Sequence, residues 1–338
     1  MTKAAEMSHA PGRRWAPVTT KSFVSRFGLL ALWLIEIVVF IAIAPKIFLN
    51  INTFSQLASS QASLVVLALA VVPTLAVGEI DLSVASVMGL GAIIFGQLNG
   101  VLGISPIVAI IVAVGTSAVA GLISGLITVL LRVQGLIVTL GMGTLALGIT
   151  LLVSNSQSVG GVSPELSHFV NLPIGGVSVA FFIAIVLALV LWYVIRHMPL
   201  GRSMLFLGFN REVARLSGIR GNRLRILSFV AGSLIAGIAG VISIGVAGGA
   251  DPTSFQPLLL PAFAATFLGT LVFTPGQVNP LGTVVSLYFL ATGIFGIQVL
   301  GAGTWVSNVF YGVALVAIIA VSGIAANYGH LIGRKNHG

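Results

Sequence analysis

Residues 105 to 131 read SPIVAIIVAVGTSAVAGLISGLITVLL, a run of 27 residues without a charged side chain. A helix of about 20 apolar residues crosses the hydrocarbon core of a bilayer, so this run can span a membrane and tilt within it. Nine similar runs lie near residues 28 to 49, 59 to 78, 82 to 98, 135 to 154, 174 to 195, 226 to 247, 258 to 273, 280 to 298 and 303 to 325. The sequence therefore predicts an all-α fold, a polytopic transmembrane helix bundle of about ten spans.

The composition supports a membrane protein. Of the 338 residues, 57% are hydrophobic and only 7% are charged, whereas soluble domains carry about a quarter charged residues. The net charge of +9 does not indicate nucleic acid, because the basic residues stand between apolar runs without an aromatic-interleaved basic face. The absence of cysteine excludes disulfides, thiolate metal sites and cysteine nucleophiles.

The distribution of Lys and Arg predicts the orientation, because basic residues near span ends are retained in the cytoplasm. With the N-terminus inside, fifteen of the sixteen basic residues fall on the cytoplasmic side: Lys3, Arg13, Arg14, Lys21, Arg26, Arg132, Arg196, Arg202, Arg211, Arg215, Arg220, Arg223, Arg225, Arg334 and Lys335. Only Lys46 falls outside, where the loops carry Glu165 and Asp251. The expected organisation is a cytoplasmic tail, a transmembrane domain and a second cytoplasmic tail, over residues 1–27, 28–325 and 326–338.

No catalytic chemistry is visible in the sequence. A phosphate-binding loop needs Gly-rich backbone followed by Lys-Ser/Thr, and none of the four lysines has that context. The five histidines are isolated, so a metal cluster is not expected, and no Ser/His/Asp arrangement stands out. We expect no catalytic residue, no metal and no cofactor on this chain.

The loop predicted over residues 196–225 holds seven arginines and a single acid, Glu212. At its centre, Asn210 can cap a short helix, Glu212 suits the first turn and Gly218 can end it. A helix this short is marginal alone and needs a partner surface. The loop is either a solvated determinant of topology or a rigid coupling element that docks a cytoplasmic protein, and the candidate coupling residues are Asn210, Arg211, Glu212, Ala214, Arg215, Leu216, Ser217 and Gly218.

A second group of polar residues interrupts the apolar pattern at Glu79, Asp81 and Ser83. Asp81 or Ser83 can cap the following helix. Alternatively, the break belongs to a discontinuous helix that lines a translocation path, where Glu79 could contact a solute or pair with an arginine during gating. Asn155 and Gln157 are further candidates for the path, although both also fit a polar helix end.

Glu36 lies near the middle of the first apolar run. An unpaired charge there costs about 2.5 to 3.5 kcal/mol on insertion scales. We therefore expect Glu36 to face protein or to be protonated, and a buried, hydrogen-bonded acid is favoured over a role in transport.

Three motifs carry a resemblance to the permeases of the ribose, xylose and galactoside class of bacterial ATP-binding-cassette (ABC) importers. The first is the coupling-loop pattern Gly201, Arg202, Gly208, Asn210, Glu212, Ala214, Arg215, Leu216, Ser217, Gly218 and Ile219. The second is GEIDLSVAS at 78 to 86, and the third is Thr139, Leu140, Gly148 and Asn155. The chain departs from the family where Glu79, Ala85 and Phe209 replace common glycines, and where TPGQVNP at 274 to 280 replaces a Gly-rich turn.

The resemblance implies a multi-pass permease of the bacterial inner membrane. It implies that two permeases pair, that each coupling loop docks on an ATP-binding subunit which uses ATP and Mg, and that a periplasmic or lipid-anchored binding protein delivers a monosaccharide-like solute. Two other functions stay open at this stage. One is an ion-coupled secondary transporter that uses Glu36, Glu79 or Asp81, and the other is a scaffold or channel protein.

Overall fold

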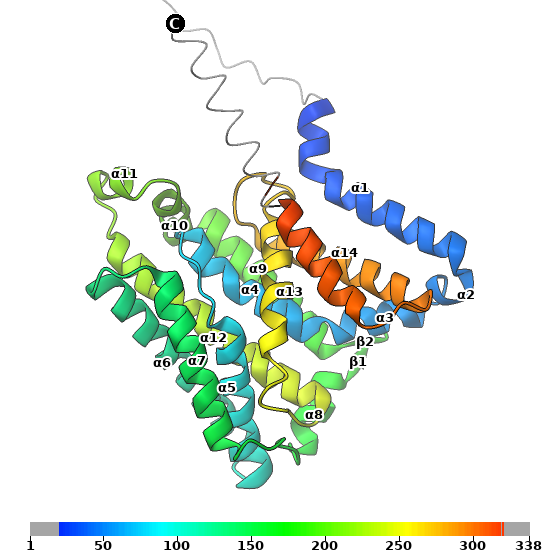
Figure 1. The fold of residues 1–338 in the computed structure, drawn as a ribbon, viewed down its shortest axis with the longest axis horizontal. Coiled ribbons are helices and arrows are strands. Elements are labelled where there is room, and N and C mark those ends of the chain that lie inside the picture. Colours follow the sequence, from blue (N-terminus) through cyan, green and yellow to red (C-terminus); the bar gives the residue numbers. More distant parts are fainter. Residues whose placement is uncertain (1–19, 319, 321–338) are drawn as a thin grey trace, which may run out of the picture.

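The computed structural model describes residues 20 to 318 and residue 320. Most of the expected N-terminal tail and the whole of the expected C-terminal tail, 326–338, lie outside the described residues. The helices are α1 Thr20–Ile43, α2 Pro45–Phe48, α3 Ile51–Ser60, α4 Ala62–Ala76, α5 Val84–Gly96, α6 Pro106–Leu130, α7 Gly135–Val153, α8 Pro164–Asn171, α9 Val179–His197, α10 Pro199–Phe209, α11 Arg211–Leu216, α12 Gly221–Ala247, α13 Leu259–Gly269 and α14 Pro280–Val299 (Figure 1). The π-helix η1 Gln97–Val101 extends α5, the 3₁₀-helix η2 Gln256–Leu258 precedes α13, and a last helix covers Trp305–Ile318.

The described residues confirm a polytopic all-α protein. Seven helices are long and apolar enough to cross a membrane, and the pair α3 and α4, bent by 46° at a break, makes an eighth span if it is counted as one. The two remaining apolar runs form the shorter helices Gln256–Gly269 and Trp305–Ile318. All ten predicted runs thus contain helix, and the described parts of these two helices are shorter than the ~20 residues that a membrane crossing needs.

Helix α12 lies at the centre of the fold, where it packs against α4, α5 and α6. Small residues allow this close approach. A Cβ on Gly121 of α6 would collide with the carbonyl of Phe229 on α12, and a Cβ on Gly240 of α12 would collide with the carbonyl of Met88 on α5. Close contact between backbones is the usual basis of helix association in lipid, where no hydrophobic force drives it.

Helices α9, α13 and α14 cover the other side of α4, and α1 packs on α14 at the edge (Figure 1). Trp33 of α1 donates a hydrogen bond to Thr292 of α14 at 3.1 Å. One carboxylate oxygen of Glu36 lies against Gly293 of α14, so this acid faces protein as expected. Its Oε2, however, is buried without a hydrogen-bond partner among the described residues, so the expected hydrogen bond is not seen at that oxygen.

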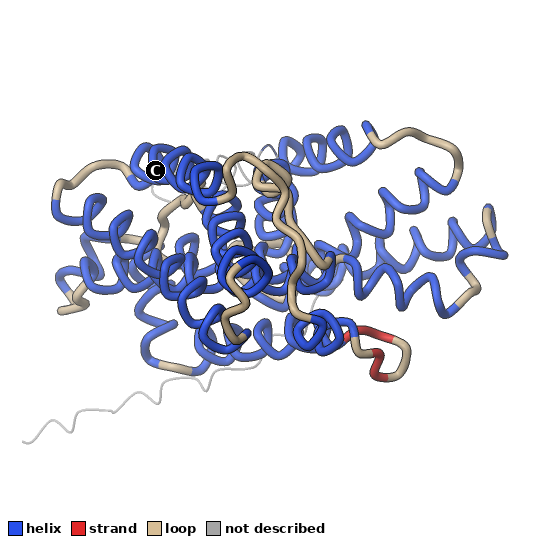
Figure 2. Tube along the Cα trace, turned by 90° about the horizontal axis from the view of Figure 1, so that it is seen from below, coloured by secondary structure: helices blue, strands red, loops and turns tan. Residues whose placement is uncertain are grey.

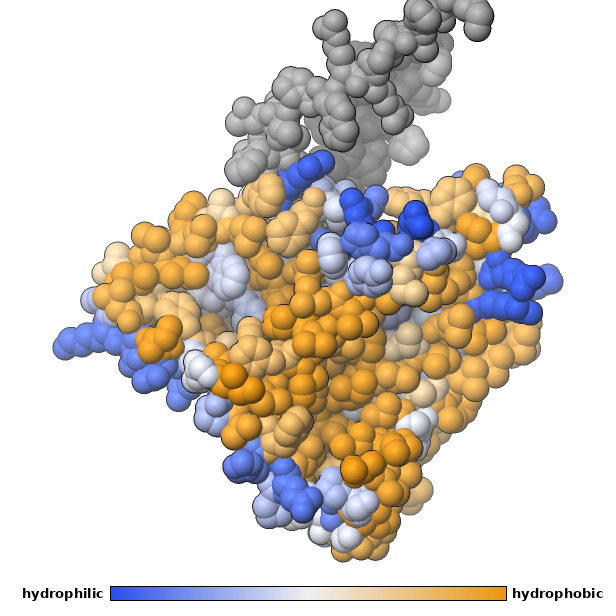
Figure 3. All heavy atoms as spheres, turned by 180° about the vertical axis from the view of Figure 1, so that it is seen from behind, coloured by the Kyte–Doolittle hydropathy of each residue, from blue (hydrophilic) through white to orange (hydrophobic). Residues whose placement is uncertain are grey.

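The described residues contain one short hairpin, β1 Pro173–Ile174 and β2 Val177–Ser178, which projects from the edge of the helical body (Figure 2). It lies within the polar stretch that follows α7, together with α8. A broad hydrophobic area covers much of the surface, with hydrophilic residues mostly at its margins (Figure 3). Such a surface suits contact with lipid rather than with water.

Candidate functional site

Helix α11 is the short helix that the sequence predicted in the basic loop. Its first turn is capped by Asn210, whose Oδ1 accepts hydrogen bonds from the backbone N–H groups of Glu212 and Val213 at 3.0 and 3.1 Å. These N–H groups have no partner within the helix, and an Asn cap that satisfies them contributes about 1 kcal/mol. The predicted cap is confirmed.

The end of α11 also follows the prediction. Gly218 has φ +78°, a left-handed conformation that glycine adopts without strain. The N–H of Ile219 donates to the carbonyl of Ala214 at 3.0 Å and closes the last turn. The helix is shorter than the predicted segment 210–218, because Asn210 is extended and Ser217 already lies outside the helix.

The basic loop contains a second helix, α10, that the sequence analysis missed. Its signals were present in the sequence, since Pro199 suits a first helical turn and the buried Met204 and Leu207 are three residues apart. Helices α9 and α12 also extend into the predicted loop 196–225, so the connection between them is only residues 198–220.

Helix α11 has the partner surface that so short a helix requires. A small apolar core joins α11 to α10, to the start of α12 and to the end of α4, and its members are Ala76, Val77, Met204, Leu207, Ala214 and Leu224. Ala214 is fully buried in it. Beside this core a Cβ on Gly208 would lie 2.5 Å from the carbonyl oxygen of Ala76, so α10 packs through its backbone directly on the end of α4.

Glu79 joins the break between α4 and α5 to α11 and to the first turns of α12. Its Oε1 accepts from Arg211 of α11 and from Arg225 of α12, each at 2.7 Å. Arg211 also donates to the carbonyl of Gly78 at 3.1 Å. The side chains of Glu79 and Arg225 are only 6% and 15% exposed, whereas that of Arg211 is 52% exposed. Burial of this carboxylate is therefore compensated by two guanidinium groups.

Asp81 and Ser83 organise the same break. The Oδ1 of Asp81 accepts from the N–H of Ser83 at 2.9 Å and from its hydroxyl at 2.6 Å. Ser83 is the N-cap residue of α5, but no side-chain hydrogen bond caps this helix, so the expected capping by Asp81 or Ser83 is not seen. Thr139 of α7 accepts from the N–H of Leu82 at 3.0 Å and so fixes the break from the other side. The Oδ2 of Asp81 is buried and has no partner among the described residues.

Helix α7 begins at this break. A Cβ on Gly135, the first residue of α7, would lie 2.5 Å from the Oε2 of Glu79. The carboxylate thus lies beside the N-terminus of a helix, where the helix dipole favours a negative charge. The starts of α5, α7 and α12 and the end of α4 consequently meet around one buried carboxylate.

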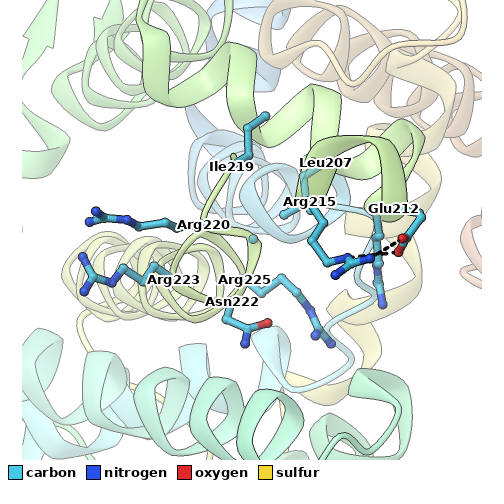
Figure 4. A pocket seen from close by; sticks show the side chains of 10 residues that line it. Leu207, Glu212, Arg215, Ile219, Arg220, Asn222, Arg223 and Arg225 are labelled. Atoms are coloured by element: carbon cyan, nitrogen blue, oxygen red, sulfur yellow. Dashed lines mark hydrogen bonds and ion pairs between the residues drawn. The ribbon is translucent and has the colours of Figure 1, made fainter. Parts of the chain in front are cut away.

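A groove of about 500 Å³ opens between α11 and the start of α12 (Figure 4). Glu212 pairs with Arg215 at 2.5 Å on one side of it, while Arg220 and Arg223 project away from α11 on the other. Among the described residues, neither Arg220 nor Arg223 forms an ion pair. The exposed groove is basic and lacks a compensating acid other than Glu212.

Asn155 and Gln157 do not belong to this site. They follow the end of α7, whose 19 residues span about 28 Å at 1.5 Å per residue, so they lie at the far end of α7 from Glu79. Both are exposed at a polar helix end. The predicted path residues therefore form two groups, one beside α11 and one at the opposite end of α7.

Asp251 joins two loops at that opposite end, since Ser158 donates to it at 3.1 Å and Thr253 donates to it from both its hydroxyl and its N–H. These hydrogen bonds to the charged form, chiefly those from Thr253, hold the pKa of Asp251 below its usual range. Over the part of the chain that the structure describes, no three His, Asp or Glu side chains are grouped as a metal site would require.

Comparisons with known proteins match this chain to permeases of transport systems. The family model described as "Branched-chain amino acid transport system / permease component" matches residues 53–319. The D-allose transport system permease protein of Escherichia coli is 26% identical over 306 residues, which cover 90% of this chain and 94% of the relative. The ribose import permease protein of the same organism is 28% identical over 314 residues, which cover 92% and 96%.

A third relative is the autoinducer 2 import system permease protein of Photorhabdus laumondii. It is 28% identical over 310 residues, which cover 90% of this chain and 92% of the relative. No solved structure matches this chain.

Proposed function

The chain belongs to the family of branched-chain amino acid transport system permease components, whose model covers residues 53–319, and on this premise we propose that it imports a monosaccharide or a related polyhydroxylated solute. It is a membrane-spanning permease subunit of an ABC importer. The relatives named for ribose, D-allose and autoinducer 2 support a small polar solute. Ten spans, cytoplasmic termini and a location in the bacterial inner membrane are part of the proposal.

The observation that carries the proposed mechanism is the attachment of α11 to the membrane helices. Helix α11 presents Val213 and Leu216, which are 45% and 75% exposed, on a helix whose opposite side buries Ala214. An apolar face beside a basic groove suits a protein partner, and in this family the partner is the ATP-binding subunit. The proposed coupling residues are therefore those of α11, which include Arg211, Glu212 and Arg215, with its cap Asn210 and its exit residues Ser217 and Gly218.

Movement of α11 has a direct route into the membrane domain. If closure of the ATP-binding subunits displaces α11, the core around Ala214 and the contact of Gly208 with Ala76 move the end of α4. The ion pairs of Glu79 with Arg211 and Arg225 link the break to α11 and α12, so that these parts move together. Since α5 and α7 begin at this break, a shift there changes the positions of two candidate pathway helices together.

The same geometry argues against the alternative of an ion-coupled carrier. Of the three acids that this alternative invokes, Glu79 is held by two arginines. Two opposite charges stabilise its ionised form, which makes Glu79 a poor site for taking up a proton or a cation during a transport cycle. Membership of the permease family favours the importer as well.

The remaining parts of the proposed complex come from the family. A second permease, identical or homologous, completes the pathway, and a periplasmic or lipid-anchored binding protein delivers the solute at the end where Asn155 and Gln157 lie. The permease itself needs only weak contacts with the solute, because the binding protein supplies affinity. ATP and Mg are used by the partner ATPase.

Cross-linking tests the docking of α11. The chain contains no cysteine, so V213C introduces a single attachment point for a short photoactivatable maleimide. In membranes that contain the whole complex, we expect V213C to capture the ATP-binding subunit. The matched control is F169C on α8, where Phe169 is 55% exposed. Capture of that subunit from position 169, or its absence from position 213, contradicts the proposed docking.

A further inference from the structure

A recess that takes no part in the proposed coupling lies between the start of α1, the end of α9 and the turn from α13 to α14. It consists of two adjoining cavities of about 340 and 310 Å³. Both cavities are lined by Arg196, Phe273, Thr274 and Gln277. They therefore form one continuous recess with two different ends.

One end of the recess is basic. Arg26 of α1 and Arg196 of α9 both line the smaller cavity, and no carboxylate lines either cavity. Among the described residues, neither arginine forms an ion pair or a side-chain hydrogen bond. Thr274 and Gln277 add a hydroxyl and an amide whose side chains are likewise not engaged in any hydrogen bond within the described part of the chain.

Among the described residues, no acid compensates these two arginines. The described carboxylates all lie elsewhere: Glu36, Glu79, Asp81, Glu165, Glu212 and Asp251. A ligand that carries negative charge would complement both arginines, which are exposed at the recess. A guanidinium group presents its N–H donors in a planar fork that matches phosphate geometry.

The other end of the recess is apolar. It is lined by Trp192, Ile195, Leu205, Val278 and Leu281. Trp is enriched at membrane interfaces, because its ring is apolar and its N–H is polar. A basic end and an apolar end within one recess suit an amphipathic ligand rather than a free inorganic anion.

Backbone contacts hold the walls of the recess in place. The N–H of Phe273 donates to the carbonyl of Arg26 at 3.0 Å, which ties the turn to α1. Asn279 caps α14 through the N–H of Leu281 at 3.1 Å and donates to the carbonyl of Val272 at 3.2 Å. The turn that carries Thr274 and Gln277 is thus fixed at both ends.

The recess also lies at the level where the apolar helices end. Arg26 begins the apolar window of α1, Arg196 is in the last turn of α9, and α14 begins at Pro280. Ends of membrane-spanning helices lie near the phospholipid headgroups, and basic pockets between such helices on the cytoplasmic side bind anionic headgroups. The predicted cytoplasmic position of both arginines fits that setting.

We propose that this recess binds an anionic phospholipid, with the phosphate between Arg26 and Arg196 and the lipid body along the apolar wall toward Trp192 and Leu281. Thr274 and Gln277 supply further hydrogen-bond donors to the headgroup. A purely topological role would explain why both arginines lie on the cytoplasmic side. It would not explain why two arginines from different helices share one cavity with Thr274 and Gln277. The proposal does not depend on the transported solute or on the docking of α11.

Lipid binding to the purified full chain tests the proposal. Phosphatidylglycerol is titrated against a phosphatidylcholine background, and bound lipid is counted by native mass spectrometry. We expect the doubly substituted R26Q/R196Q protein to bind phosphatidylglycerol about 30-fold more weakly, since each arginine near the headgroups contributes a factor of about five. The matched control is R220Q/R223Q, which removes the same charge from the groove beside α11 and should leave binding unchanged.

Two results overturn the proposal. One is an equal loss in R220Q/R223Q, which would show that only overall charge matters. The other concerns the thermal stability of the wild type. If inorganic phosphate alone stabilises it as much as phosphatidylglycerol does, the ligand is a free anion. Thermal unfolding in phosphatidylcholine checks that R26Q/R196Q is folded, and if it is not, the single substitution Arg196→Gln is measured in its place.

Discussion

Replacing Glu79 with glutamine separates charge from shape at the point where α11 meets the membrane helices. Glutamine keeps one carbonyl oxygen at the position of the carboxylate but removes the charge that pairs with Arg211 and Arg225. The loss of the negative charge affects Arg225 more than Arg211. The side chain of Arg225 is only 15% exposed, whereas that of Arg211 is 52% exposed and can turn to water. Most of the effect should therefore come from the bond with Arg225.

The magnitude follows from these exposures. Removing one partner of a buried ion pair costs about 3–5 kcal/mol, and glutamine avoids part of this cost because its carbonyl oxygen can still accept a hydrogen bond from the charged Arg225. We expect Glu79→Gln to lower the free energy of unfolding by about 2 kcal/mol and to leave membrane insertion intact. In reconstituted complexes we expect fewer solute molecules imported per ATP hydrolysed, because the break no longer follows α11.

The assay combines unfolding in detergent with uptake and ATPase measurements in proteoliposomes. Glu165→Gln is the matched control, since Glu165 is an exposed acid of α8 without an ion pair among the described residues. A double-mutant cycle with Arg225→Gln should show coupling of about 1–2 kcal/mol, because the two residues are in contact. Additive effects in the cycle, or a wild-type ratio of uptake to ATP hydrolysis in Glu79→Gln, would refute the reasoning.

Other predictions concern α11 itself. Asn210→Ala should cost about 1 kcal/mol through loss of the cap, measured by unfolding, and Asn210→Ser should restore most of it. Glu212→Ala should barely change stability, because its pair with Arg215 is exposed. Gly218→Trp should strain the left-handed exit from α11 by about 1–2 kcal/mol. Both substitutions should uncouple ATP hydrolysis from uptake, and normal coupling in both would contradict the assignment of α11 as the coupling helix. A cysteine replacing Arg215 should react with an impermeant maleimide only from the cytoplasmic side, and labelling from outside intact cells would reverse the predicted orientation.

Much of the fold was predictable because lipid imposes a simple rule. Apolar runs of helical length must satisfy their own backbone groups, so all ten runs could be recognised as helices from sequence alone. Helix α10 was missed because its eleven residues mix Gly, Arg and Ser with apolar residues. Its buried face depends on contact with the end of α4, which no local pattern reveals.

The candidate site likewise combines features that neighbouring residues predict with contacts between distant positions that they do not. The Asn210 cap and the Gly218 exit are local features, and both could be predicted from neighbouring residues. The bond between Glu79 and Arg225 joins positions 146 residues apart, so the sequence left open whether Glu79 contacts a solute or pairs with an arginine, and it did not indicate which arginine. The separation of Asn155 and Gln157 from Glu79 could have been predicted, since they follow the C-terminal end of α7 and Glu79 lies at its start.

The most direct test of the account is solute uptake into proteoliposomes that contain this chain with its ATP-binding subunit, supplied with binding protein on the side opposite ATP. Labelled ribose and allose represent the proposed class of solute, and leucine represents the amino acids named in the family description. We predict uptake of a sugar that requires ATP, the ATP-binding subunit and the binding protein together, and that persists when ion gradients are collapsed. Uptake driven by an ion gradient without ATP, or ATP-dependent uptake of leucine alone, would contradict the account.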